Sequence, residues 1–253
     1  MTDTRVIAIA NHKGGAAKTT TAVNLAASLA QDGQPTLLID LDPQGNASTW
    51  LGADADTAGP SVFDPGHPFG SLVRASSVAG LALLPAAQSL AEAERRLAQD
   101  RSAETLLSRL MPRAALAEWR YVIIDTPPAR GLLTINALAA ADRALVPVEA
   151  HIMALTGVVQ ILGTIRLVQE SCNPALSLLG FVVCRFNTRN RHCAEVRERL
   201  AAKFPRQVLN TVVRENIRLA EAPSFGVPIA AYAPSSTGAA DYRALAAEIV
   251  AMP

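Results

Sequence analysis

The sequence predicts an α/β fold, in which one mostly parallel, twisted β-sheet carries helices on both faces. Short apolar runs alternate with longer helical segments along the 253 residues, as expected for strands joined by crossover helices. Three of these runs, at 6–10, 36–39 and 121–124, are continuous, which is typical of parallel strands buried on both faces. No linker-like stretch divides the chain, so we expect a single domain over residues 1–253.

The first strand leads directly into a glycine-containing loop and then into a helix expected at 19–31. In this context, backbone amides and the positive end of a helix dipole can hold a phosphate group. Lys18 would neutralise the β- and γ-phosphates, and the Thr19 hydroxyl would hold Mg²⁺. The candidate nucleotide-binding loop comprises Lys13, Gly14, Gly15, Ala16, Ala17, Lys18, Thr19 and Thr20.

The use of lysine supports this assignment. The chain has three lysines and twenty arginines, and two of the lysines, Lys13 and Lys18, lie in the loop. Because arginine is the usual base elsewhere in the chain, lysine here indicates a need for a compact ammonium group.

Acidic residues end two of the other predicted strands. The strand at 35–41 has Asp40 at its end and is followed by Asp42, and the strand at 121–125 ends in Asp125. Because ligands bind at the carboxyl ends of parallel strands, we expect these three carboxylates to lie beside the phosphate loop. Asp125 would hold Mg²⁺ through a coordinated water.

The remaining elements follow in order. Residues 52–80 are rich in Gly, Pro, Ser and Asp and predict an irregular surface segment. Further strands are expected at 81–85, 144–148, 178–184 and 208–213, helices at 90–99, 103–110, 132–140, 154–169, 192–203 and 238–251, and a turn at 221–228.

Composition excludes several classes of protein. The net charge of +1 gives no global attraction to nucleic acid, and no run of about 18 apolar residues predicts a membrane span. The three cysteines, Cys172, Cys184 and Cys193, have no metal-ligand spacing and fit a reduced, cytoplasmic protein.

The loop K-G-G-x-x-K-T resembles the deviant Walker A motif of the ParA/MinD family of dimeric ATPases. The similarity continues through the stretches 40–46, 125–128, 131–134, 136–138, 146–148, 154–155 and 216–224, whereas His151 departs from the family pattern. It therefore spans almost the whole chain. Ala17 departs from the family pattern, because a glycine is frequent at that position.

The resemblance implies a role for each motif residue, with ATP and Mg²⁺ as cofactors. Lys13 would reach across an ATP-dependent homodimer to the partner's phosphates, and Gly14 would lie at the dimer interface. Asp42 would position or activate the attacking water, while Asp40, Asp125 and Thr19 would act near the metal. The expected catalytic residues are Lys13, Lys18, Asp42 and Asp125.

A local excess of positive charge suggests a surface for DNA. Nine basic and three acidic residues lie between positions 185 and 218, so this segment is much more basic than the rest of the chain. Few aromatic residues lie between these charges, which favours sequence-independent contacts to a duplex backbone over base stacking. The candidate DNA-binding residues are Arg189, Arg191, Arg214 and Arg218.

The function implied is chromosome or plasmid partitioning by a weak ATPase. A ParB-like protein or another cargo adaptor would stimulate hydrolysis, and the protein would be cytoplasmic and associated with the nucleoid. Positioning of a protein organelle or cluster, such as a carboxysome or chemoreceptor array, remains an alternative. A membrane-associated regulator like MinD is disfavoured because the tail at 239–253 offers only Arg243 as a base. We therefore expect no stable membrane association.

Overall fold

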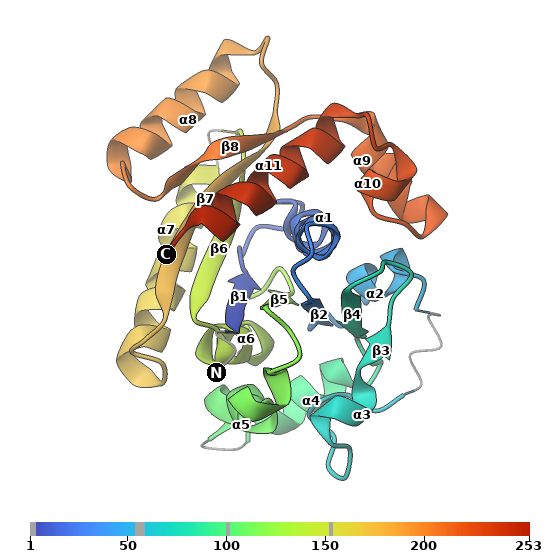
Figure 1. Ribbon diagram of the computed structural model, residues 1–253. Coiled ribbons are helices and arrows are strands. Elements are labelled where there is room, and N and C mark those ends of the chain that lie inside the picture. Colours follow the sequence, from blue (N-terminus) through green and yellow to red (C-terminus); the bar gives the residue numbers. More distant parts are fainter. Residues whose placement is uncertain (1–3, 54–58, 100–101, 152–153) are drawn as a thin grey trace.

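The computed structural model describes residues 4–53, 59–99, 102–151 and 154–253 (Figure 1). An eight-stranded sheet with the order β3-β4-β2-β5-β1-β6-β7-β8 forms its centre. All neighbouring strands are parallel except β3 and β4, which are antiparallel. The strands are β1 Arg5–Ile9, β2 Thr36–Asp40, β3 Arg74–Ala75, β4 Leu81–Leu84, β5 Tyr121–Asp125, β6 Arg143–Glu149, β7 Ser177–Phe186 and β8 Val208–Arg214. The predicted fold class is confirmed.

Helices cover both faces of this sheet. The longer ones are α1 Lys18–Gln31, α4 Leu90–Leu97, α6 Leu132–Ala140, α7 Ala154–Ser171, α8 Arg191–Lys203 and α11 Thr237–Ala251. Shorter helical segments are α2 Asn46–Trp50, α3 Phe69–Leu72, η1 Ala103–Thr105, α5 Leu106–Leu110, η2 Arg113–Leu116, α9 Ile217–Glu221, η3 Ala222–Phe225 and α10 Ile229–Tyr232.

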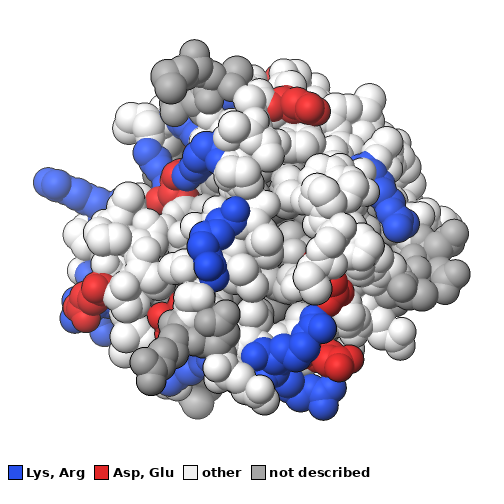
Figure 2. Space-filling view, turned by 90° about the horizontal axis from the view of Figure 1, so that it is seen from below, with Lys and Arg blue, Asp and Glu red and all other residues white. Residues whose placement is uncertain are grey.

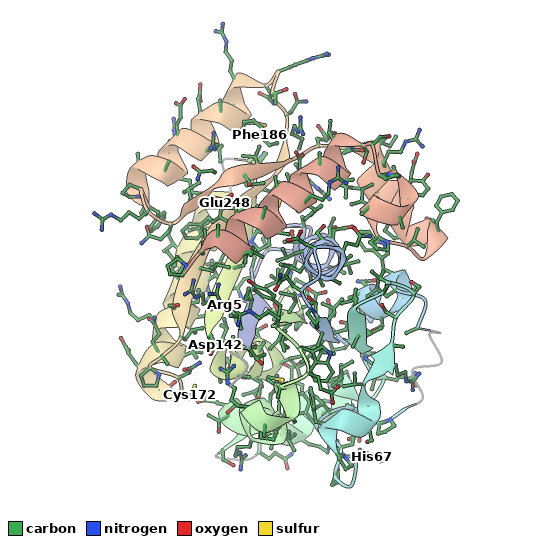
Figure 3. All side chains as sticks on the ribbon, viewed as in Figure 1. Arg5, His67, Asp142, Cys172, Phe186 and Glu248 are labelled. Atoms are coloured by element: carbon green, nitrogen blue, oxygen red, sulfur yellow. The ribbon has the colours of Figure 1, made fainter. Side chains whose placement is uncertain are left out.

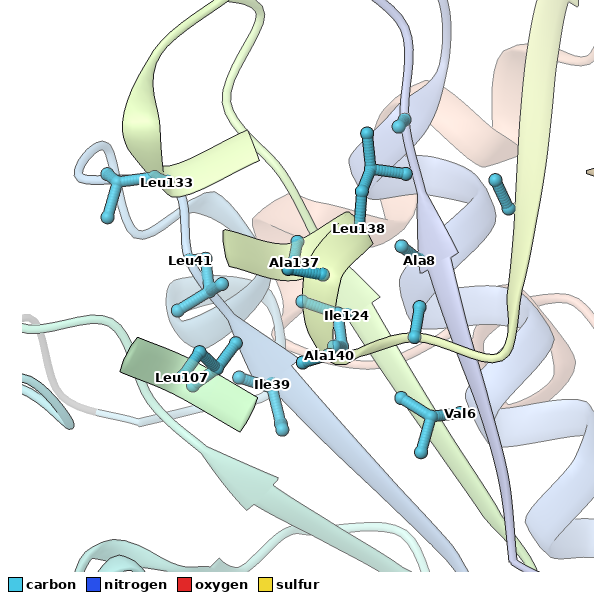
Figure 4. Close-up of a cluster of buried hydrophobic side chains, with 14 of the residues drawn as sticks. Val6, Ala8, Ile39, Leu41, Leu107, Ile124, Leu133, Ala137, Leu138 and Ala140 are labelled. Carbon is cyan, nitrogen blue, oxygen red and sulfur yellow. The ribbon is translucent and has the colours of Figure 1, made fainter. Parts of the chain in front are cut away.

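Successive residues of the central strands enter two separate hydrophobic cores. Val6, Ala8 and Ile124 pack with α6 on one face, as Figure 4 shows. Ile7 and Ile123 pack on the other face, where α1 and α11 lie. This burial on both sides explains why the strands read as continuous apolar runs.

The strand register brings the predicted site residues to one edge of the sheet. Asp125, the last residue of β5, pairs with Ile9 of β1 on one side and with Asp40 of β2 on the other. The candidate nucleotide-binding loop at 13–20 lies between β1 and α1, so the loop and the acidic strand ends are neighbours. Figure 3 shows the two ends of the sheet well separated, with Phe186 where β7 ends and Arg5 where β1 starts.

The opposite edge holds the end of the chain. Arg5 Nη1 donates a hydrogen bond to the carbonyl oxygen of Met252 at 2.7 Å, and Arg143 donates to the carbonyl oxygen of Pro253. The C-terminal residues are therefore fixed at the starts of β1 and β6.

Some short elements differ from the prediction. The segment at 52–80 contains α3 and the strand β3, so the expectation of a wholly irregular segment was wrong there; residues 54–58 lie outside the described part. The two residues of β3 are both exposed and are too few to show a pattern. Within the turn expected at 221–228, Ala222–Phe225 form the 3₁₀ helix η3 and the following residues remain irregular; the preceding helix α9 was not predicted.

No helix among the described residues is long and apolar enough to cross a bilayer. All three thiols are free, with Cys184 and Cys193 buried and Cys172 half-buried. Within the ranges that the structure describes, no group of three or more His, Cys, Asp or Glu side chains is placed to hold a metal ion.

Candidate nucleotide-binding site

The loop between β1 and α1 has the backbone shape of an anion site. Gly15 and Ala17 adopt left-handed conformations, with φ of +74° and +64°. Within the described part of the chain, no side chain caps the first amides of α1. These amides therefore remain available to an anion, at the positive end of a 14-residue helix.

Two anchors fix the start of this loop. Asn11 Nδ2 donates to the carbonyl oxygen of Pro147 on β6 at 2.7 Å, and Asn11 Oδ1 accepts from the backbone N–H of Lys13 at 3.0 Å. His12 Nε2 lies 2.9 Å from Thr164 Oγ1 on α7. The loop is thus attached to β6 and α7 before any ligand binds.

Lys18 is a buried cation that faces the acidic strand ends. Its side chain is only 6% exposed, and desolvation lowers its pKa, although Asp125 and Asp42 act in the opposite direction. A buried ammonium beside uncapped amides is suited to a polyanionic ligand, which supplies the counter-charge that water cannot.

Asp125 is the most unusual group in the site. It is fully buried, and neither carboxylate oxygen accepts a hydrogen bond of regular geometry from a described residue, although the Thr19 side chain lies near enough to act on it. Burial raises its pKa well above the ordinary value, and the nearby Asp40 raises it further, while Thr19 and Lys18 lower it. An unsatisfied carboxylate beside a threonine hydroxyl fits the oxygen ligands that Mg²⁺ prefers.

Asp40 has a different environment, although it pairs with Asp125 in the sheet. Its oxygens accept hydrogen bonds from Ser48 N at 2.8 Å, Ser48 Oγ at 2.7 Å and Asp42 N at 3.1 Å. Burial raises the pKa of Asp40 to about 6, against the effect of these hydrogen bonds. Its carboxylate is therefore already satisfied by the protein, and it fixes α2 and Asp42 in place.

Asp42 lies just past the end of β2 and is also buried. Its Oδ1 accepts from the backbone N–H of Gln44 at 3.0 Å, which orients the carboxylate at the turn into α2. The electrostatic effect of Asp42 on Lys18 places the two side chains in the same site.

Lys13 forms an ion pair within its own subunit. Its Nζ lies 2.6 Å from Glu149 Oε2 at the end of β6, and Glu149 Oε1 lies 3.4 Å from Arg185 Nη1. The pKa of Glu149 is lowered, chiefly by its hydrogen bond with Lys13. One carboxylate thus links the phosphate loop to the end of β7.

A cavity of about 520 Å³ adjoins the loop, and sequence reasoning did not identify it. Ala17 and Thr20 line one side, and the other lining residues come from the ends of β7 and β8, from α9 and from α11: Cys184, Arg185, Val213, Arg214, Glu215, Asn216, Ile217, Leu219, Ala220 and Tyr242. The available sequence signal was general: these residues follow two further parallel strands at the same edge.

The structure divides the four candidate DNA-binding residues into two pairs. Arg189 and Arg191 are exposed at and just before the start of α8. Arg214 donates from Nε at 3.0 Å and from Nη2 at 2.5 Å to Asp241, and Arg218 pairs with Glu221 at 2.9 Å. Arg214 is therefore engaged in a structural ion pair that fixes α11 to β8.

The described residues form no concentrated positive patch on the face of the molecule that points downward in Figure 1. Figure 2 shows its Lys and Arg side chains dispersed over a mostly uncharged surface, with acidic residues beside several of them. In contrast, α8 lies at the top of Figure 1, away from this face, and Arg189 and Arg191 are exposed at its start.

The sequence of this chain is similar to a known group of proteins. A sequence profile described as an AAA domain matches residues 4–178. The chain is 46% identical to the chromosome-partitioning ATPase Soj of Thermus thermophilus over 98% of its length and 96% of that protein. It is 42% identical to the chromosome partitioning protein ParA of Myxococcus xanthus over 97% of its length and 88% of that protein.

The chain belongs to the ParA/Soj family of ATPases. Solved structures agree with this assignment. A structure described as cobyrinic acid a,c-diamide synthase from Mycobacterium smegmatis with bound ADP and magnesium has a TM-score of 0.83 at 34% identity, covering 96% of this chain and 93% of that one. A variant of Cyanothece McdA in complex with ATP, at 23% identity and covering 100% of this chain and 98% of that one, shares the fold with a TM-score of 0.88. The resemblance inferred from the ParA-type motifs is confirmed.

Proposed function

We propose that this ParA/Soj-type ATPase binds Mg²⁺ and ATP at the loop, dimerises on ATP and binds duplex DNA without sequence specificity to partition a chromosome or plasmid. The observation that carries the proposal is the buried Asp125, which accepts no regular hydrogen bond from the described residues, beside Thr19 and Lys18, at the start of the uncapped helix α1. Relatives at 42–46% identity are named chromosome-partitioning proteins.

The buried residues would divide the work of phosphoryl transfer. Thr19 and Asp125 would hold Mg²⁺, which supplies charge neutralisation at the phosphates when bound. Lys18 would contact the β- and γ-phosphates, and Asp42 would orient the attacking water. We assign Asp40 a positioning role, because its oxygens already accept bonds from Ser48 and from the amide of Asp42. The adjoining cavity would take the adenine base.

Features of the loop support the proposed dimer. A Cβ atom added to Gly14 would meet none of the described atoms within 4 Å, and its φ is not in the left-handed region. Nothing in the single subunit therefore requires glycine at this exposed position, which agrees with a close approach by a second copy. Lys13 would leave Glu149 to reach the phosphates of that copy.

The proposed DNA surface centres on the exposed Arg189 and Arg191, with Arg218 contributing if its bond to Glu221 opens. Arginines in such a position bind the phosphates of the DNA backbone and do not distinguish base edges. A ParB-like or other cargo-bound protein would complete the site and stimulate hydrolysis, and the ATP-bound dimer would associate with the nucleoid.

A gel-shift series with duplex DNA tests the proposal. We expect a shift with ATP and Mg²⁺, and little or none with ADP or without nucleotide. Lys18→Ala should abolish ATP binding and the shift together. Equal DNA binding in all three nucleotide states, or unchanged ATP affinity in Lys18→Ala, would contradict it.

A charge-reversal pair locates the DNA surface. Arg189→Glu should weaken ATP-dependent DNA binding and reduce its salt dependence, because one phosphate contact is lost and one is repelled. Arg109→Glu is the control, since α5 lies at the opposite end of the molecule from α8 (Figure 1). Equal effects of the two substitutions would place the DNA surface elsewhere.

A further inference from the structure

Two residues that line the cavity beside the loop have an unusual backbone conformation. Among the described residues, the non-glycine residues with positive φ are Ala17, at +64°, and Arg185, at +52°, and both line this cavity. A side chain in this conformation carries backbone strain, and such strain persists where the surrounding structure imposes it, often at ligand sites. Ala17 belongs to the phosphate loop, whereas the proposed function gives Arg185 no role.

The end of β7 is irregular at the same residue. The pairing of β7 with β8 shifts register between Cys184 and Phe186, so Arg185 lies at a bulge. Bulges next to active sites commonly redirect a side chain that a regular strand would aim elsewhere. Cys184 is fully buried, whereas the side chain of Arg185 is 58% exposed at the cavity.

The surroundings of Arg185 hold its guanidinium without covering it. Arg185 Nη1 donates to Glu149 Oε1, at 3.4 Å, and that carboxylate is shared with Lys13. Ile217 also lines the cavity and is 72% exposed, which is unusual for a large apolar side chain. The cavity therefore offers both a planar cation and an apolar surface, and aromatic ring systems bind well to each.

We propose that Arg185 is a nucleotide-contacting residue whose guanidinium stacks on the base, with the bulge placing the residue at the cavity and Glu149, which does not line the cavity, bonding the guanidinium from outside. This inference rests on the proposed placement of the base in the cavity. It makes the strained residue at the end of β7 part of ATP binding. It also gives one carboxylate, Glu149, contact with both the base-binding residue and Lys13.

Calorimetric titration of the full chain with ATP, ADP and inorganic tripolyphosphate tests this inference. Arg185→Ala should weaken the binding of ATP and of ADP by a similar factor, on the order of fivefold for a lost cation–π contact. The affinity for tripolyphosphate should be unchanged. Arg185→Lys should not restore affinity, because an ammonium keeps the charge but lacks the plane. Arg206→Ala, at an exposed arginine in the turn before β8, is the matched control.

Arg185→Gly separates binding from folding. Glycine relieves the positive φ, so this variant should melt at or above the temperature of Arg185→Ala while binding ATP as weakly. The inference is overturned if both variants bind ATP as tightly as the natural chain does. It is also overturned if the binding of tripolyphosphate is weakened as much as that of ATP, since the contact would then be to phosphate. If the natural chain itself fails to bind ATP, the proposed function fails with it.

Discussion

Two aspartates paired across neighbouring strands are expected to respond oppositely to the same substitution. Asp125 is a buried carboxylate that accepts no hydrogen bond of regular geometry from the described residues, whereas Asp40 accepts three hydrogen bonds. Asp125→Asn should raise the free energy of unfolding of the nucleotide-free protein by about 1–2 kcal/mol, because it removes a carboxyl group whose ionisation is opposed by burial and by the nearby Asp40. Asp40→Asn should lower it by about 1–3 kcal/mol, because donors lose their acceptor. Urea denaturation at about pH 7.5, above the ordinary pKa of a carboxyl group, measures both, and a shared sign would contradict the assignment.

The same carboxylates predict a pH dependence. Burial raises the pKa of Asp40 to about 6, and it also raises the pKa of Asp125. The folded state therefore binds protons at these two groups more tightly than the unfolded chain does. The contribution of Asp40 to stability is therefore greatest at low pH and is lost as pH rises from about 4 to about 6, and the contribution of Asp125 also falls as pH rises above about 4. The free energy of unfolding of the Asp125→Asn variant should fall less over this pH range than that of the natural chain. Parallel stability–pH curves for the two proteins would disprove this.

Ala17 carries a strain that glycine would remove. Its φ of +64° lies where a Cβ is unfavourable. Ala17→Gly should stabilise the nucleotide-free protein by about 0.5–1 kcal/mol, measured by thermal unfolding. Ala16→Gly, at the adjacent buried residue without positive φ, should not stabilise it.

Among the elements around the site, the short helix α2 connects two strands through hydrogen bonds of Ser48. Ser48 donates from Oγ to Asp40 and accepts from the backbone N–H of Ala86 at 2.8 Å, so one hydroxyl joins β2 to the segment after β4. Ser48→Ala should cost about 1–3 kcal/mol of stability and lower ATP turnover by misplacing Asp42. Thr49→Ala, one residue on and exposed, should leave both unchanged. Full turnover in Ser48→Ala would remove α2 from the site.

The sequence allowed prediction of the elements that show a strong pattern. Each buried strand of the parallel sheet was expected, and so were helices such as 132–140, because continuous apolar runs and helical periodicity survive in the sequence alone. The sequence also predicted that the loop at 13–20 and the acidic strand ends would be neighbours, since their motifs are local, and the strand register brings them together. The elements that were missed, such as β3 and α9, are two to five residues long and mostly exposed. The cavity was missed because its lining is assembled from distant segments of the chain.

At the scale of the whole molecule, the exposed glycine of the loop tests the dimer. Gly14→Val should leave the melting temperature of the nucleotide-free protein unchanged, since a Cβ there meets open space. It should prevent dimerisation with ATP, measured by light scattering in an Asp42→Ala background that blocks turnover. Gly70→Val is the control, because Gly70 also has open space and lies away from the loop. A dimer of normal strength in Gly14→Val would exclude close approach at this residue.

The attachment of the C-terminal residues at the starts of β1 and β6 has a practical consequence. Arg5 and Arg143 hold the carbonyl groups of Met252 and Pro253 at the edge of the sheet that faces away from the loop. A fluorescent protein fused after Pro253 should therefore sit clear of the ATP-dependent contacts. Live-cell imaging with such a fusion can follow where the protein accumulates while leaving its switching chemistry intact.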